Sequence, residues 1–154
     1  MHMAETLARS LKRADCHFDL VEHEHSATSL ESARKAGIPA TRMAKPVILD
    51  DRRGHYLMAV LPANRQLDLG KVRSGPWRWQ LTSEQSLGGL FKDCERGAIP
   101  ALGEAYGMGM LIDPLLARQA DIYLEAGDHQ NLVRLPIEEF FRLAPSARLC
   151  ELSA

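Results

Sequence analysis

Two apolar runs separated by a short charged turn are the feature that most restricts the fold of this chain. The runs cover residues 46–49 and 56–61, and residues 50–54 between them read Asp-Asp-Arg-Arg-Gly. Runs rich in Val, Ile, Leu and Tyr that are bounded by Asp and Gly are typical of neighbouring β-strands. The sequence therefore predicts a β-hairpin over residues 46–61, and the rest of the chain has to cover it.

Helix and strand patterns alternate irregularly around this hairpin. Helical spacing and capping residues predict helices over residues 4–14, 28–36, 65–73, 82–91 and 136–143, and apolar runs predict strands over residues 18–21, 77–81, 110–112, 122–124 and 132–135. Because no regular strand–helix–strand repeat is present, we expect the α+β class with a mixed or antiparallel sheet. A glycine-rich loop over residues 93–109 interrupts the pattern, and ordered loops of this length are usually functional.

The chain has 154 residues, of which 45% are apolar and 25% charged, with a formal net charge of −1. This length and composition predict one domain spanning residues 1–154. No apolar run approaches the roughly 20 residues of a membrane helix, and the N-terminus has no signal-peptide pattern. We therefore expect a cytoplasmic protein without membrane contact. The near-neutral net charge argues against a protein that coats nucleic acid nonspecifically, but it is compatible with a local basic patch.

Patterns typical of metal sites, redox motifs and serine hydrolases are absent from the sequence. The cysteines, Cys16, Cys94 and Cys150, are widely spaced and form no Cys-x-x-Cys pair, so we interpret them as unreactive thiols. His23 and His25 form a His-x-His pair that no further ligand pattern accompanies, and we predict neither a metal site nor a cofactor. No G-x-S-x-G motif marks a nucleophilic serine.

Three places carry candidate functional groups. Lys45 precedes Pro46, whose ring holds the preceding residue extended, so the ammonium has a fixed direction at the mouth of a strand. Such an ammonium can bind a carbonyl, a phosphate or a carboxylate, although a solvated surface lysine has the same pattern. The segment 97–103 can present backbone N–H groups to an anion, or it can be a structural loop. His129 lies in a predicted hairpin turn, where it can exchange protons or simply form the turn.

Trp77 and Trp79 alternate beside Arg73 and Arg78. This combination is found on surfaces that bind single-stranded nucleic acid. A two-residue spacing on a strand also places both rings on one face, and we interpret the pair as core packing.

Five blocks of the sequence, in this order and separation, resemble a known family. They are His25-Ser-Ala-Thr-Ser, Ala44-Lys45-Pro-Val-Ile-Leu, Met58-Ala-Val-Leu-Pro62, Phe91-Lys-Asp-Cys-Glu-Arg-Gly-Ala-Ile-Pro-Ala-Leu-Gly103 and Ala126-Gly-Asp-His129. The family is that of the YbaK-like aminoacyl-tRNA deacylases, which are related to the editing domain of bacterial prolyl-tRNA synthetase. The resemblance implies a compact domain in which helices flank a curved mixed or barrel-like β-sheet. It also implies hydrolysis of the ester bond of a mischarged tRNA, with a small amino acid on tRNA-Pro or a related tRNA as the expected substrate.

The same resemblance implies roles for single residues. Lys45, Gly97 and Ala98 are the expected catalytic residues, because the lysine orients the aminoacyl end and the loop wraps its carbonyl. The expected substrate-binding residues are His25, Ile99, Pro100, Gly103 and His129. A lysine with an ordinary pKa of about 10.4 is protonated at neutral pH, so Lys45 suits a positioning role better than that of a general base. We expect N–H groups around Gly97 and Ala98 to stabilise the oxyanion, and a ribose hydroxyl of the tRNA to help activate or position the water.

Two alternatives stay open beside the enzyme. The same fold can hold tRNA or an acyl ligand without turnover, whereas an unrelated interaction domain would leave Lys45, Gly97 and His129 far apart. A protein that binds tRNA needs a surface for phosphates, and the candidate residues are Arg42, Arg52, Arg53, Lys71, Arg73 and Arg78. An aminoacyl-tRNA synthetase is a candidate further partner.

Overall fold

The computed structural model describes residues 3–154, in which helices and strands are mixed along the chain. The helices are α1 (Glu5–Arg13), α2 (Ser29–Ala36), α3 (Glu84–Leu90), α4 (Pro114–Ala117) and α5 (Ile137–Leu143), with short 3-10 helices η1 (Ala40–Arg42), η2 (Leu69–Lys71) and η3 (Gly103–Tyr106). The strands are β1 (Asp19–Glu22), β2 (Ala44–Asp50), β3 (Tyr56–Pro62), β4 (Gln80–Leu81), β5 (Gly109–Ile112), β6 (Asp121–Glu125), β7 (Asn131–Pro136) and β8 (Arg148–Leu149). Within residues 3–154, none of the helices has the length and apolar character needed to cross a membrane.

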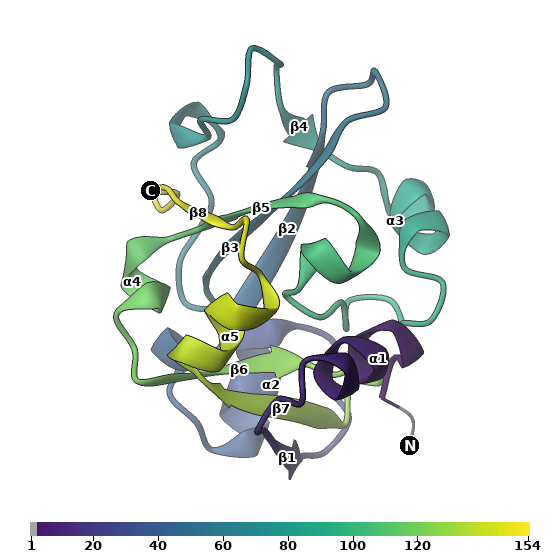
Figure 1. The fold of residues 1–154 in the computed structure, drawn as a ribbon, viewed down its shortest axis with the longest axis vertical. Helices are drawn as coiled ribbons and strands as arrows, with labels where there is room; N and C mark the ends of the chain where they lie inside the picture. Colours follow the sequence, from purple (N-terminus) through teal and green to yellow (C-terminus); the bar gives the residue numbers. More distant parts are fainter. Residues whose placement is uncertain (1–2) are drawn as a thin grey trace.

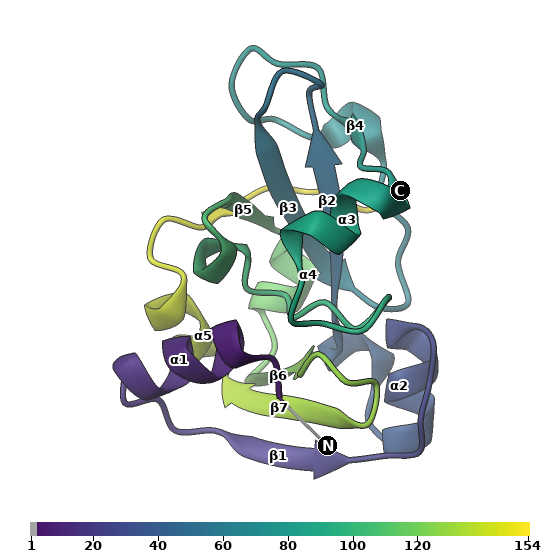
Figure 2. The same ribbon diagram turned by 90° about the vertical axis from the view of Figure 1, so that its right-hand side faces the viewer.

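The strands form two open sheets. The larger sheet has the order β4-β2-β3-β5-β8, in which β3 pairs with β5 and β5 with β8 in parallel. The smaller sheet has the order β1-β7-β6 and is antiparallel. An isolated parallel bridge between Met43 and Tyr123 joins the two sheets. Figures 1 and 2 show the smaller sheet lying across one end of the long β2–β3 hairpin, with α1, α2 and α5 around it.

β3 is buried along almost its whole length because both faces of the larger sheet are covered. Met58 and Val60 lie in the main core, which includes side chains of α1, β6, β7 and α5. Leu57 and Ala59 point to the other face and belong to a second apolar cluster. Neighbouring side chains of a strand point to opposite faces, so a strand that is buried on both faces is a continuous apolar run in the sequence.

The predicted α+β class and most predicted elements are confirmed. The β-hairpin spans β2 and β3, and the helix predicted over residues 28–36 is α2. Its cap is the Thr28 side chain, which accepts a hydrogen bond from the Glu31 backbone N–H, and it ends at Gly37 with a φ of 70°. The strands form a mixed sheet, as the sequence predicts, but the two sheets stay open and do not close into a barrel.

Several local predictions are wrong because contacts from distant segments decide the outcome. The helix predicted over residues 65–73 is reduced to η2, and the strand predicted over residues 77–81 is reduced to β4. β8 has two exposed residues that pair only with the distant β5, so no periodicity marks it. The prediction that both tryptophans pack in the core is wrong for Trp77. This residue is 40% exposed, and its ring stacks on His55.

Gly103, one of the expected substrate-binding residues, is buried where the loop meets the core. A Cβ on Gly103 would lie 2.9 Å from Met108 Cγ and 3.0 Å from Met58 Cβ. The residue therefore allows the end of the glycine-rich loop to pack on β3.

We expect Gly103→Ala to lower the free energy of unfolding by about 1–3 kcal/mol, because the added methyl overpacks this contact. Urea denaturation measures the change. The matched control is Gly88→Ala in α3, where a Cβ meets nothing within 4 Å and alanine favours the helix. A Gly103→Ala variant as stable as the parent protein would contradict the packing role.

Candidate functional site

The turn between β6 and β7 holds His129 in a fixed and unusual conformation. The Asp128 carboxylate accepts hydrogen bonds from the backbone N–H groups of Gln130 (3.1 Å) and Asn131 (3.0 Å), and from the Asn131 side chain (2.8 Å). His129 has a φ of 61°, in the left-handed region, and its side chain lies in the interior with only 4% of the residue exposed. The composition of this turn is common in hairpins. Its hydrogen bonds nevertheless direct the His129 imidazole into the interior.

The His129 ring packs against the backbone of the glycine-rich loop. Its Nε2 bonds to the carbonyl oxygen of Arg96. Because a carbonyl only accepts, this pairing assigns the proton to Nε2 and leaves Nδ1 without a proton in the neutral ring. Nδ1 is buried and has no hydrogen-bond partner among residues 3–154. The imidazole thus fixes the loop at Arg96 and keeps one unused acceptor.

Gly97 packs closely against two neighbouring segments. It has a φ of 81°, and a Cβ on it would lie 2.8 Å from the Ala27 carbonyl oxygen and 3.3 Å from the His129 ring. The His25 ring lies 5.3 Å from the His129 ring, centroid to centroid, and its Nε2 lies 3.8 Å from Glu95 Oε2. Three predicted site residues, His25, Gly97 and His129, are therefore brought together from separate segments.

The backbone N–H groups of the loop are not equivalent. Ala98 is fully buried, and its N–H donates to the carbonyl oxygen of Glu95 at 3.0 Å. Gly97 is exposed, and its N–H has no acceptor in the part of the chain that the structure describes. Gly97 can therefore offer a hydrogen bond to an anion, whereas the Ala98 N–H is already engaged. Pro100, further along the loop, is buried.

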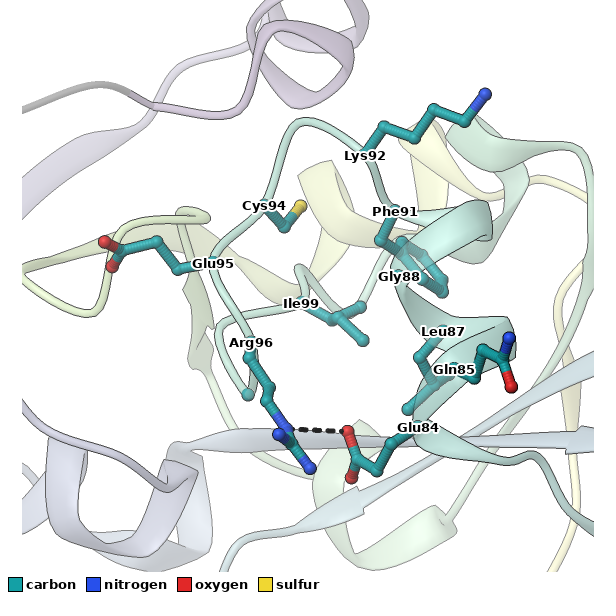
Figure 3. A pocket seen from close by; sticks show the side chains of 11 residues that line it. Glu84, Gln85, Leu87, Gly88, Phe91, Lys92, Cys94, Glu95, Arg96 and Ile99 are labelled. Atoms are coloured by element: carbon teal, nitrogen blue, oxygen red, sulfur yellow. Dashed lines mark hydrogen bonds and ion pairs between the residues drawn. The ribbon is translucent and has the colours of Figure 1, made fainter.

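A hollow of about 350 Å³ opens on the other side of Gly97, between α3 and the loop. Figure 3 shows the apolar side chains of Leu87, Phe91 and Ile99 in its interior, and the Glu84–Arg96 ion pair (3.1 Å) at its edge. Of the expected site residues, Gly97 and Ile99 line this hollow, and neither Lys45 nor His129 does.

Cys94 also lines the hollow, but it is not a nucleophile at neutral pH. Burial raises the pKa of its thiol to about 12, and the neighbouring Asp93 carboxylate acts in the same direction. The nucleophile in a cysteine enzyme is the thiolate. A protonated Cys94 therefore fits the interpretation of the cysteines as unreactive.

Among the described residues, Lys45 makes its one side-chain hydrogen bond outside the cluster of His25, Gly97 and His129. Its Nζ donates to the carbonyl oxygen of Arg65, and no hydrogen bond within residues 3–154 joins it to the cluster. The parallel bridge of Met43 to Tyr123 nevertheless sets β2 beside β6. Lys45 follows Met43 on a strand that runs in the same direction as β6, and β6 leads directly into the His129 turn. Burial lowers the pKa of the Lys45 ammonium.

A buried chain of polar groups that sequence reasoning missed lies behind the cluster. The hydroxyls of Ser26 and Ser32 are 2.6 Å apart, and Ser32 Oγ donates to Glu125 Oε2 at 2.7 Å. The Ser26 N–H in turn donates to the His129 carbonyl oxygen at 3.2 Å. The chain therefore ties α2, the segment that carries His25, and the end of β6 to one another. The one signal in the sequence is the acidic Glu125 at the end of an apolar strand.

Glu125 is fully buried, and its environment disfavours the carboxylate. Burial raises its pKa to about 7, and the Asp128 charge adds to the increase while the Ser32 hydrogen bond opposes it. Its Oε1 has no partner among the described residues. Those residues also contain no group of three or more His, Cys, Asp or Glu side chains that could hold a metal ion.

Comparisons with known proteins give a family and a fold. The sequence profile of a family described as the aminoacyl-tRNA editing domain matches residues 23–143. The structure is similar to a candidate trans-editing enzyme for prolyl tRNA synthetase, with a TM-score of 0.84, 20% identity, and coverage of 100% of this chain and 98% of that one. It is also similar to the hypothetical protein APE2540, with a TM-score of 0.83, 18% identity, and coverage of 97% and 100%. No curated protein matches the sequence.

We expect Glu125 to make the stability of the fold depend on pH. Its pKa of about 7 in the folded chain lies above the ordinary value of 4.5, so between these values the folded state keeps a proton that the unfolded state releases. The contribution to stability is complete below the ordinary pKa and is lost as the pH rises through about 7, by about 3 kcal/mol.

The variant Glu125→Gln cannot ionise but keeps an acceptor for Ser32, so we expect the unfolding free energy to vary less with pH than in the parent protein. Urea denaturation of both proteins at about pH 5 and about pH 8 measures the difference. The same decrease between the two pH values in both proteins would show that Glu125 is not the group responsible.

Proposed function

Because this chain belongs to the aminoacyl-tRNA editing domain family, we propose that it hydrolyses the ester bond of a mischarged tRNA as a free-standing deacylase. The expected substrate carries a small amino acid on tRNA-Pro or a related tRNA. The observation that most supports the proposal is the contact of Gly97 with His129, beside His25, because it joins three separate matching blocks in one place. A cytoplasmic location and a partner synthetase go with this proposal.

The exposed N–H of Gly97 is the proposed donor to the oxyanion. Hydrolysis of an ester passes through a tetrahedral intermediate whose oxygen is negatively charged, and one well-placed donor contributes about 3 kcal/mol to its stabilisation. The Ala98 N–H already donates to Glu95, so the oxyanion site proposed for this conformation has one backbone donor rather than two.

The proposed role of His129 is to position the loop. Its ring is buried and its Nε2–H donates to the Arg96 carbonyl oxygen, so the ring is not placed to accept a proton from water as a general base would. Its ring instead fixes the position of Gly97 next to His25. The activation of water falls to a hydroxyl of the terminal ribose, which lies next to the ester in the substrate itself.

Lys45 is the proposed group that orients the aminoacyl end. Its Nζ donates to the backbone carbonyl oxygen of Arg65. To orient the substrate, it would donate the same kind of hydrogen bond to the ester carbonyl oxygen. Four methylenes between the backbone and the ammonium let the same group reach a substrate that enters beside β6.

A binding module without turnover is the second candidate. It is favoured by the engaged Ala98 N–H and by the pairing of Lys45 with Arg65. Binding of tRNA without release of amino acid distinguishes this candidate from the enzyme.

Deacylation of tRNAs charged with alanine, cysteine, serine, threonine and proline tests the proposed function. We expect release of at least one small amino acid by the parent protein. The variant Lys45→Ala should then lose about 100-fold or more in kcat/KM, because an oriented charged donor is removed from the reacting carbonyl.

Lys12→Ala, at an exposed position of α1, is the matched control and should keep the parental rate. A Lys45→Ala protein that deacylates as fast as the parent would remove Lys45 from the mechanism. A parent protein that binds these tRNAs without deacylating any of them would support the binding module.

A further inference from the structure

A second group of exposed side chains lies at the end of the larger sheet opposite the smaller sheet. The β2–β3 connection contributes Arg53 and His55, and the segment before β4 contributes Trp77 and Arg78. Figures 1 and 2 show both segments projecting from the same end of the molecule. A hollow of about 360 Å³ between them is lined by Asp51, Arg53, Pro76, Trp77 and Arg78. We call Arg53, His55, Trp77 and Arg78 the arginine–tryptophan patch.

The Trp77 ring is held in one orientation and yet remains exposed. One contact is a stack on the His55 ring, with centroids 4.2 Å apart and planes 26° apart. Gly75 supports the ring as well, because a Cβ there would lie 2.5 Å from it. Trp79 meets it edge-on at 5.9 Å and anchors the segment by donating from Nε1 to the Ser74 carbonyl oxygen at 2.9 Å. A fixed aromatic stack with 40% of Trp77 exposed is suited to a ligand with flat rings.

The patch has an excess of positive charge, because two arginines and one carboxylate, that of Asp51, line its hollow. The side chains of Arg53 and Arg78 form no hydrogen bond or ion pair with any residue in 3–154. The Asp51 side chain is only 2% exposed, and its carboxylate is occupied by the His55 ring and by the N–H groups of Arg53 (2.9 Å) and His55 (3.1 Å). In a chain with a net charge of −1, two free arginines beside a stacked pair are a local attraction for anions.

Arginines that meet phosphates, next to aromatic rings that stack on bases, are the combination with which proteins bind RNA strands. Lys45 precedes Asp51 by six residues on β2 and its turn, a separation of about 20 Å at about 3.3 Å per residue. The patch is therefore too far from Lys45 to meet the esterified nucleotide, but nucleotides next to it along the tRNA span this distance.

We propose that the arginine–tryptophan patch binds the acceptor end of the tRNA, with Arg53 and Arg78 on phosphates and the His55–Trp77 stack on a base. This proposal rests on the proposed function and adds to it the surface that selects a whole tRNA over a free aminoacyl ester. In this proposal the patch provides affinity for the tRNA, and the ester is hydrolysed at the candidate site.

The double variant Arg53→Gln/Arg78→Gln tests the phosphate contacts. We expect KM for aminoacyl-tRNA to rise with kcat unchanged, and the slope of log KM against log salt to fall by about 0.7–0.9 for each phosphate that the variant no longer neutralises. Hydrolysis of an aminoacyl-adenosine, which lacks the other nucleotides, should not change. The control is Arg9→Gln/Arg13→Gln on the exposed part of α1, which removes the same charge and should keep the parental KM.

A pair of substitutions at one position tests the stack. Trp77→Ala should raise KM about fivefold or more, in the range expected when one base no longer stacks on an aromatic ring. Trp77→Phe keeps an aromatic face and should recover most of the affinity. Equal urea midpoints for the two variants show that folding does not account for the difference, and equal KM values would overturn the stacking contact.

The parental KM and salt dependence in the double arginine variant would overturn the proposed RNA surface. If the parent protein deacylates no aminoacyl-tRNA, the proposed function fails independently, and fluorescence anisotropy with uncharged tRNA then decides the patch. Weaker binding by the double variant than by the α1 control supports the patch, and equal binding overturns it. Self-association that disappears in the double variant while tRNA binding is unchanged would assign the surface to a second copy of the chain and overturn the proposal.

Discussion

The contact between the Gly97 backbone and the His129 ring determines how the candidate site is arranged. Three segments meet there, and they approach this closely because residue 97 has no side chain: a Cβ would lie 2.8 Å from the Ala27 carbonyl oxygen. Gly97 and His129 both have positive φ angles, of 81° and 61°. Left-handed backbone costs a residue with a Cβ roughly 1–2 kcal/mol, so His129 keeps this conformation only because its turn and the Arg96 carbonyl oxygen hold it.

The polar groups behind this contact connect the site to the stability of the fold. Glu125, Ser32 and Ser26 form a buried chain that ends on the backbone of His129. A buried carboxyl with one unpartnered oxygen is unfavourable when ionised, and burial accordingly raises the pKa of Glu125 to about 7. Natural proteins depart from full satisfaction of buried polar groups mainly at functional sites. The same residues therefore hold the backbone of His129, and we expect them to make the stability of the fold depend on pH.

In the proposed function, the arrangement of the sheets places the chemical step and the binding of the larger substrate at different ends of the molecule. The long β2–β3 hairpin carries Lys45 near the smaller sheet at one end and Arg53 at its turn at the other. In the proposed mechanism, one rigid element thus sets the distance between the ester and the rest of the tRNA. This division would let a chain with a net charge of −1 bind a polyanion through a local patch.

Local patterns in the sequence predict the elements of the fold well, and the resemblance to the YbaK-like family is confirmed by the editing-domain match and the similar structures. His25, Gly97 and His129 could be singled out because they lie in matching blocks, and the structure brings them together. The burial of Gly103 and the chain to Glu125 could not be predicted, because both depend on contacts between distant segments. The bond from the Ala98 N–H to the Glu95 carbonyl oxygen is local, but it depends on a loop conformation that the composition of the loop does not specify. Trp77 shows the same limit, since alternation predicts its face but not what covers it.

Two glycines with nearly the same backbone provide the most direct test of the central contact. Gly97 and Gly107 have φ angles of 81° and 79°, but a Cβ meets Ala27 and His129 at residue 97 and nothing within 4 Å at residue 107. Alanine therefore strains the backbone equally at both positions and displaces the loop at only one. In the deacylation of mischarged tRNA, we expect Gly97→Ala to lose about 100-fold or more in kcat, the effect of removing one oxyanion donor, and Gly107→Ala to stay near the parental rate. Parental kcat in Gly97→Ala, or equal losses in both variants, would contradict a site built on this contact.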